Sequence, residues 1–428
     1  MQTSFSLAQL ADPDIAEANA ILRSCVHCGF CTATCPTYVL LGDELDSPRG
    51  RIYQIKDMLE TRRPAPEPVV THLDRCLSCL SCMTTCPSGV HYMHLVDTAR
   101  DYIRRTHVRP SAERLLRWML ATVLPRPGLF RLALFGAMLA RPFARLLPRR
   151  LRGMVRFAPR HPVPPMATDR AGVHPAVGLR RGRVALLAGC AQQVLAPQIN
   201  AAAIRLLNRH GVEVVVLPDT GCCGALVLHM GEMPAARAQA ARNIRVWARE
   251  LDRGALDAIV LSASGCGTTI KDYGHLFRTD PDMAEDAARV GAATRDLTEY
   301  LDAIGLNPPR RFVGLSVAYH SACSLQHGQK VTALPKRLLE QAGFEVRDPV
   351  EGHLCCGSAG TYNLLQPDLA TRLRDRKTAN IEATGATVVA AGNLGCITQI
   401  ASGTSLPVLH TVELLDWATG GPKPAVLN

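Results

Sequence analysis

Two short cysteine-rich runs constrain the fold of this chain more than any other feature. The first run, CVHCGFCTATCP, covers residues 25–36, and a near-copy, CLSCLSCMTTCP, covers residues 76–87. Each run places four thiols within eleven residues. Thiols at this density indicate metal or cluster ligands, so the fold must gather the side chains of each run around a centre.

The spacing of both runs, Cys-x2-Cys-x2-Cys-x3-Cys-Pro, matches the bacterial ferredoxin pattern for [4Fe–4S] clusters. Two-residue spacers let a tight loop wrap three corners of a cubane, and the fourth cysteine ligates the cluster of the other run. The expected ligands are Cys25, Cys28, Cys31 and Cys86 for cluster 1, and Cys76, Cys79, Cys82 and Cys35 for cluster 2. The alternative is zinc in four-thiolate sites, which the doubled spacing with its trailing proline disfavours.

The remaining eight cysteines belong to a duplication. In each copy a cysteine is followed by 31 residues, then by a CCG triplet, and later by a Gly-Cys pair. The two copies are offset by about 130 residues, so each is a domain-sized repeat. The thiols of the first copy are Cys190, Cys222, Cys223 and Cys266, and those of the second are Cys323, Cys355, Cys356 and Cys396.

Strands and helices are predicted to alternate within each copy. The predicted strands are 183–189, 212–218 and 257–264 in the first copy, and 313–319, 344–348 and 386–392 in the second. The predicted helices are 198–209, 233–252, 332–342 and 367–384. This alternation favours a parallel α/β sheet, whose strands all end at one edge. We therefore expect three loops in each copy to bring four thiols together as a metal site.

The basic charge is confined to one segment. Residues 101–160 contain fourteen Arg and no Lys, against one Asp and one Glu. A nucleic-acid-binding protein would spread its basic residues over a reading surface, so we expect no nucleic acid partner. Within residues 113–157, apolar residues recur at helical intervals between arginines, and Pro125, Pro127, Pro142 and Pro148 divide the segment into short helices.

Three roles fit this basic segment. It can contact an anionic membrane surface, pack the ferredoxin-type part onto the CCG copies, or dock on an acidic flavoprotein. The predicted domains are a ferredoxin-type domain (1–110), a basic helical connector (111–165), a first CCG domain (166–305) and a second CCG domain (306–428).

The compartment and the electron donor are inferred from missing signals. The amino terminus has acidic residues where a secretory signal has a basic and then an apolar region, so we expect a cytoplasmic protein. No strand is followed by G-x-G-x-x-G, and SGCGTTIK lacks the order of a phosphate-binding loop. We therefore expect no flavin on this chain and a flavin-carrying partner.

The whole chain resembles the iron–sulfur subunits of flavin-linked 2-hydroxy-acid dehydrogenases, above all those of glycolate oxidase. The stretches that carry this resemblance are 22–53, 74–92 and 393–400. The resemblance implies a mostly helical ferredoxin-like domain followed by two parallel α/β CCG domains. It also implies FAD-binding partners that oxidise glycolate to glyoxylate, with electrons passing through this subunit to quinone at the cytoplasmic face of the inner membrane.

Related subunits act in lactate utilisation, glycerol-3-phosphate oxidation and heterodisulfide reduction, and these are the alternative functions. No catalytic residue is expected on this chain alone. In the heterodisulfide reductase relatives each CCG domain ends in Cys-x-x-Cys, whereas here Thr269 and Gln399 replace the last thiol. Four thiols can still hold an iron–sulfur cluster or a structural zinc that makes the two copies a scaffold for partners, and the alternative is that they are buried or redox-active thiols without a metal. Further shell candidates are Asn393, Gln399, His320 and His353.

Overall fold

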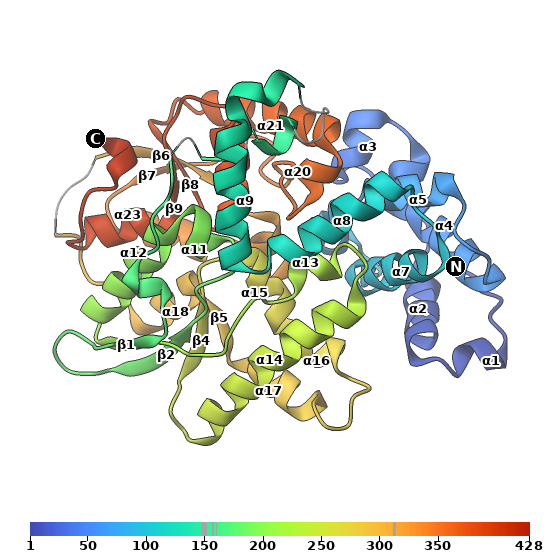
Figure 1. Cartoon of the computed structure of the whole chain (residues 1–428), viewed down its shortest axis with the longest axis horizontal. Coiled ribbons are helices and arrows are strands. Elements are labelled where there is room, and N and C mark those ends of the chain that lie inside the picture. Colours follow the sequence, from blue (N-terminus) through green and yellow to red (C-terminus); the bar gives the residue numbers. More distant parts are fainter. Residues whose placement is uncertain (147–151, 156–157, 160, 311–313) are drawn as a thin grey trace.

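The computed structural model describes residues 1–146, 152–155, 158–159, 161–310 and 314–428. Figure 1 shows a helical amino-terminal part beside two halves that each contain a sheet covered by helices. The helical part comes first along the chain, and the two sheets follow one after the other. This order confirms the predicted multidomain α/β fold.

The amino-terminal part packs short helices around an apolar core that includes Leu22, Ile55 and Leu95. The helices are α1 (Leu7–Leu10), α2 (Pro13–Ser24), α3 (Pro36–Leu41), α4 (Pro48–Thr61), α5 (Glu67–Asp74), α6 (Ser81–Thr85) and α7 (Tyr92–Thr106). Proline occupies the first turn of α2, α3, α4 and α5, where its fixed φ and missing N–H suit a helix start. Each cysteine run is thereby held between well-anchored helices.

Both cysteine loops make the same backbone turn. In the first loop His27 and Gly29 have φ values of 56° and 86°, and in the second Ser78 and Leu80 have φ values of 50° and 63°. Positive φ is uncommon for residues other than glycine, so its recurrence at matching positions marks a specific loop shape. The shape agrees with two loops that each wrap one cluster.

The first sheet has five strands in the order β1-β3-β2-β4-β5. They are β1 (Gly172–His174), β2 (Gly182–Leu186), β3 (Val212–Val216), β4 (Ala258–Leu261) and β5 (Thr294–Asp296). Neighbouring strands are parallel except β1, which pairs antiparallel with β3. Val184 and Leu186 share a core with helix α12 (Pro197–Arg209), whereas Ala185 and Leu187 share a core with helix α14 (Met233–Asp252). Helices therefore cover both faces.

The second sheet has four parallel strands in the order β7-β6-β8-β9. They are β6 (Ser316–His320), β7 (Glu345–Arg347), β8 (Val388–Ala391) and β9 (Val408–His410). The helices of this half include α19 (Leu334–Gln341), α21 (Pro367–Glu382), α22 (Leu394–Ala401) and α23 (Thr411–Ala418). The repeat predicted from the cysteines is thus a repeat of strand and helix order as well.

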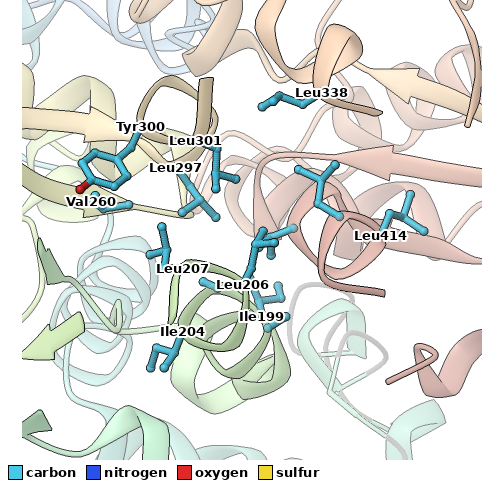
Figure 2. Close-up of a cluster of buried hydrophobic side chains, with 14 of the residues drawn as sticks. Ile199, Ile204, Leu206, Leu207, Val260, Leu297, Tyr300, Leu301, Leu338 and Leu414 are labelled. Atoms are coloured by element: carbon cyan, nitrogen blue, oxygen red, sulfur yellow. The ribbon is translucent and has the colours of Figure 1, made fainter. Parts of the chain in front are cut away.

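The two halves share one apolar core. Figure 2 shows Leu206 of α12, Leu301 of α18 (Leu297–Ile304) and Leu414 of α23 converging between the sheets. At the edge of this core the buried carboxylate of Asp416 pairs with Arg205 at 2.6 Å and with Arg209 at 2.5 Å. The halves therefore pack as one unit.

The six predicted strands appear as β2, β3, β4, β6, β7 and β8, and the predicted helices as α12, α14, α19 and α21. The sequence did not predict β1, β5 or β9, which have three residues each. Strands this short leave little alternation to recognise. The helices after β5 and β9 are capped alike, by Asp296 with Glu299 and by His410 with Glu413.

Helix α8 (Ser111–Val123) connects the amino-terminal part to the first half. Leu116 and Leu120 are buried in the core of that half. Arg117 of α8 and the preceding Arg109 both pair with Asp74 of α5, at 2.9 and 2.6 Å. The inner face of the predicted connector therefore joins the two parts of the molecule.

The connector continues as α9 (Pro127–Ala140) and η2 (Arg141–Leu146). Large apolar side chains remain exposed on α8, α9 and η2: Leu115, Trp118, Leu129, Leu132, Phe135, Leu139, Phe143 and Leu146. The rest of the predicted segment, including Pro148, lies partly outside the described residues. Among the described residues, no helix has the length and apolar character that a membrane crossing requires.

Candidate functional site

The two cysteine runs line two adjoining hollows in the amino-terminal part. The thiol-bearing residues of the first hollow are Cys25, Cys28, Cys31, Cys82 and Cys86, and those of the second are Cys35, Cys76, Cys79 and Cys82. Cys86 thus lies with the first run and Cys35 with the second, which supports the predicted exchange of the fourth ligand. Cys82 borders both hollows, so the two centres are neighbours.

The walls of both hollows suit a cluster. Around the thiols, the first hollow is lined by Val26, Phe30 and Val90, and the second by Leu77 and Leu80. Thiolate ligands in apolar surroundings are the setting in which proteins hold [4Fe–4S] clusters. The residues present therefore fit two such groups.

The first hollow opens at the surface. Cys28 is exposed, and Val26 and Phe30 beside it are 67% and 64% exposed. Burial raises the pKa of Cys79 and Cys82 well above the usual range. The first hollow therefore offers the accessible end of the pair.

A buried ion network supports the second hollow, and sequence analysis did not find it. Arg51 of α4 is 1% exposed and donates from Nη2 to Asp46 Oδ1 at 3.0 Å and to Thr37 Oγ1 at 3.0 Å. Its Nη1 lies 3.8 Å from Cys35 Sγ. Arg75 donates to the other oxygen of Asp46 at 2.8 Å. A cation hydrogen-bonded to a ligand sulfur favours the reduced form of the cluster.

The first CCG site consists of Cys190, Cys222, Cys223 and Cys266. They come from the loops after β2 and β3 and from the start of α15 (Ser264–Lys271), which follows β4. Hydrogen bonds from the thiols of Cys190 and Cys223 lower the pKa of Cys222 well below the usual range. The four thiols therefore converge as predicted, with one of them poised as a thiolate.

The second CCG site consists of Cys323, Cys355, Cys356 and Cys396, all of them buried. Cys323 precedes the π-helical turn η4 (Ser324–Gly328), and Cys396 lies on α22. Asn393 donates from Nδ2 to Cys396 Sγ at 3.5 Å, so this shell candidate supports a ligand sulfur. The ammonium of Lys377, 2% exposed, donates to the backbone oxygen of Glu351 at 2.7 Å.

The other residues predicted to complete the metal shell have different roles in the structure. Gln399 donates to the backbone oxygen of Ala370 at 3.1 Å and accepts from Asn363 at 3.1 Å, so it holds the loop. The side chain of Thr269 bonds back to Gly265 within its own helix. Neither position replaces the missing fifth thiol. His320, by contrast, lies with Cys356 and Cys396, with its ligand atom within 4.8 Å of theirs.

The second hollow adjoins the second CCG site. Leu77 and Cys79 of the second run pack in one apolar cluster with Cys323, Cys355 and Tyr362. Thr84 of α6 and His327 of η4 are joined by a hydrogen bond of 2.7 Å. Among the described residues, the apolar cluster around the first CCG site contains no thiol from the two runs. The thiols of the first hollow, those of the second hollow and those of the second CCG site therefore lie one group after another, starting from Cys28 at the surface.

Histidines near the runs help to hold the parts together. His94 of α7 contacts Glu17 of α2 at 3.2 Å and Asp272 at 3.0 Å. His275 of α16 (Tyr273–Leu276) contacts Glu17 at 2.7 Å. His94 stacks on His275, and the ring of His91 lies tilted against that of His94. These contacts link the amino-terminal part to the first half of the sheet region.

The comparisons with known proteins agree with these sites. The family model "4Fe-4S dicluster domain" matches residues 24–90, and the model "Cysteine-rich domain" matches residues 184–271 and 317–401. The chain is 42% identical to the glycolate oxidase iron-sulfur subunit of Escherichia coli, over 98% of this chain and 99% of that protein. It is 31% identical to the probable glycolate oxidase iron-sulfur subunit of Bacillus subtilis, over 93% and 94%.

More distant matches cover less or show only the fold. Lactate utilization protein A of Geobacillus thermodenitrificans is 27% identical over 55% of this chain and 98% of that protein. A solved structure, a hypothetical protein from Helicobacter pylori, has a TM-score of 0.55 and 11% identity, with coverage of 97% of this chain and 74% of that one. That likeness supports the architecture.

Proposed function

The chain belongs to the family of glycolate oxidase iron–sulfur subunits, and from this premise we propose that it carries electrons from the FAD of a partner subunit toward quinone. It is an iron–sulfur subunit of an oxidoreductase. Oxidation of glycolate to glyoxylate releases two electrons and two protons. Iron–sulfur clusters, when bound, take up and release one electron at a time, which suits a relay between a flavin and quinone.

The line of thiol sets is the observation that carries this proposal. Cys28, Val26 and Phe30 form an exposed end where a flavoprotein can approach cluster 1. Cys79 lies at the other end, packed against Cys323. Because the sequence has no dinucleotide fingerprint, the flavin belongs to the partner.

We assign the relay to cluster 1 and cluster 2, each held by the four cysteines that the spacing predicts for it. We also assign a metal centre to each CCG site. The four predicted domains, 1–110, 111–165, 166–305 and 306–428, are the proposed units of this arrangement. Glycolate is favoured over lactate because the glycolate oxidase relatives match 98% and 93% of the chain, against 55% for the lactate utilization relative. Thr269 and Gln399 in place of thiols disfavour disulfide reduction.

The test of the proposed function is reconstitution. The flavin-binding subunits, prepared anaerobically with and without this chain, are assayed for glycolate oxidation with ubiquinone and with an artificial dye as acceptor. We expect quinone reduction only when this chain is present and dye reduction in both preparations. Equal quinone reduction without this chain would contradict the proposal.

We further propose that the exposed outer face of α8, α9 and η2 contacts an anionic membrane surface. The segment 101–160 carries fourteen Arg, and its two acidic residues are paired, Asp101 with Arg105 and Glu113 with Arg117. Exposed Trp118 and Phe135 supply the apolar side chains that enter a lipid interface, while the arginines pair with anionic headgroups. This contact would hold the complex near its quinone.

Replacing Trp118 and Phe135 together by serine is expected to weaken binding to vesicles of anionic lipid roughly 10-fold or more. The reason is that two apolar side chains, which would move from water into the lipid interface on binding, are removed. Co-sedimentation with anionic and with zwitterionic vesicles measures the effect. Leu179→Ser, at a leucine that is 86% exposed outside this segment, is the control and should bind as the unmodified protein does. Equal binding of the double variant would contradict the membrane contact.

A further inference from the structure

A buried histidine nitrogen without a hydrogen-bond partner lies at the second CCG site. His320 is the last residue of β6 and is 1% exposed. Its Nε2 atom is buried and has no hydrogen-bond partner in the structure. A ligand atom of this imidazole and the Sγ atoms of Cys356 and Cys396 all lie within 4.8 Å of one another.

Such an atom needs an explanation because it is costly. A buried polar group left without a hydrogen-bond partner destabilises the fold, and buried polar groups in native proteins are normally paired. An imidazole nitrogen and two thiols this close together are groups that can hold a metal ion.

The sheet geometry directs the side chain toward the thiols. Residues two apart on a strand face the same side, so His320 shares a face with Ala318. Ala318 packs in the apolar cluster that contains Cys356 and Cys396. His320 therefore extends β6 on the side where these cysteines lie.

The first half has different residues at the matching positions. The offset of 133 residues that relates Cys190 to Cys323 also relates Leu187 to His320. Leu187 is buried in the core of the first half. Helices α14 and α21 are offset by 134 residues, as Ala236 and Ala370 show in their contacts with Gly224 and Gly357, so the buried Asn243 corresponds to Lys377. The imidazole and the lysine are therefore features of the second site alone.

The buried charge suits an anionic centre. Lys377 is 2% exposed and lies near the thiols of Cys323, Cys355 and Cys356. A buried ammonium without an anion would be strongly disfavoured. An iron–sulfur centre held by thiolates provides the negative charge.

We propose that His320 Nε2 is a fifth protein ligand, beside four cysteines, of an iron–sulfur centre at the second CCG site. The proposal rests on the proposed iron–sulfur function and makes the two CCG centres chemically different. Replacing a thiolate by imidazole raises the reduction potential of an iron–sulfur centre, as in Rieske centres. Because cluster 2 adjoins this site, His320 would favour electron flow from cluster 2 toward it.

The test uses pulsed EPR of the intact complex, reduced anaerobically. The protein carries histidine labelled with ¹⁵N in the ring, so that imidazole is distinguished from backbone nitrogen. All variants are made in a protein that carries Cys222→Ser. This substitution removes a thiol of the first CCG site, so that any CCG signal comes from the second. We expect a ¹⁵N coupling from a directly bound imidazole, its loss in His320→Leu, and its retention in His353→Asn, which removes a different imidazole near the site.

A second variant distinguishes loss of the histidine ligand from loss of the whole metal centre. His320→Cys restores a thiolate, so the centre should persist without the ¹⁵N coupling and with a lower midpoint potential in a redox titration. An unchanged coupling in His320→Leu would overturn the proposal, as would zinc without iron at this site. If the coupling is present but glycolate fails to reduce any cluster, the ligand assignment stands and the proposed function fails.

Discussion

Replacing Cys79 by serine is expected to reduce glycolate-dependent quinone reduction by roughly 100-fold, since loss even of groups that support a metal ligand costs 10- to 100-fold. Cys79 borders the second hollow and packs against Cys323, so it stands at the junction between cluster 2 and the second CCG site. The partner flavin should still be reduced by glycolate, because that step precedes the relay.

The matched comparison is Cys190→Ser, which removes a thiol from the first CCG site. No thiol of the two runs packs around that site among the described residues, so quinone reduction should fall much less than in Cys79→Ser. Both variants are assayed with quinone and with a dye that accepts electrons from the flavin. Full quinone reduction in Cys79→Ser would remove cluster 2 from the electron path.

Replacing Arg51 by methionine is expected to destabilise the amino-terminal part by about 3–5 kcal/mol, because removing one partner of a buried ion pair leaves the other charge uncompensated. That charge is Asp46, which is 0% exposed and then retains the half-exposed Arg75 at 2.8 Å and the imidazole of His72 at 3.0 Å. The midpoint potential of cluster 2 should also fall, because Arg51 no longer donates toward Cys35 Sγ.

Lys56→Met is the control for this variant. Lys56 lies on the same helix and pairs with Glu60 at 3.1 Å near the surface, where such a pair contributes about 0–1 kcal/mol. Thermal unfolding of the anaerobic holoprotein, followed by loss of the visible cluster absorption, compares the two variants. Equal melting temperatures would show that the Arg51 network does not support the cluster fold.

The cysteine pattern predicts the two loops and the repeat because its chemistry is local. The spacing of each run determines a tight loop, and the matching positive φ values at His27 and Ser78 follow from it. The repeat of Cys190 and Cys323 likewise predicted two sheets whose loops converge, since parallel strands end at one edge.

The sequence could not predict contacts between distant segments. Arg51 looks like an ordinary helix residue until Asp46 and the backbone of His72 surround it. The packing of cluster 2 on the second CCG site depends on how α6 meets η4, through Thr84 and His327. The sequence named His320 as one of four shell candidates, and the structure distinguishes it from the others because its buried Nε2 lacks a hydrogen-bond partner.

The most direct test of the relay is EPR of the complete complex after anaerobic addition of glycolate without an acceptor. The proposed path through the thiol sets of Cys28 and Cys79 predicts that signals of reduced [4Fe–4S] clusters appear as the flavin is reduced, and that they disappear when quinone is added. A flavin bleached by glycolate while every cluster stays oxidised would contradict it.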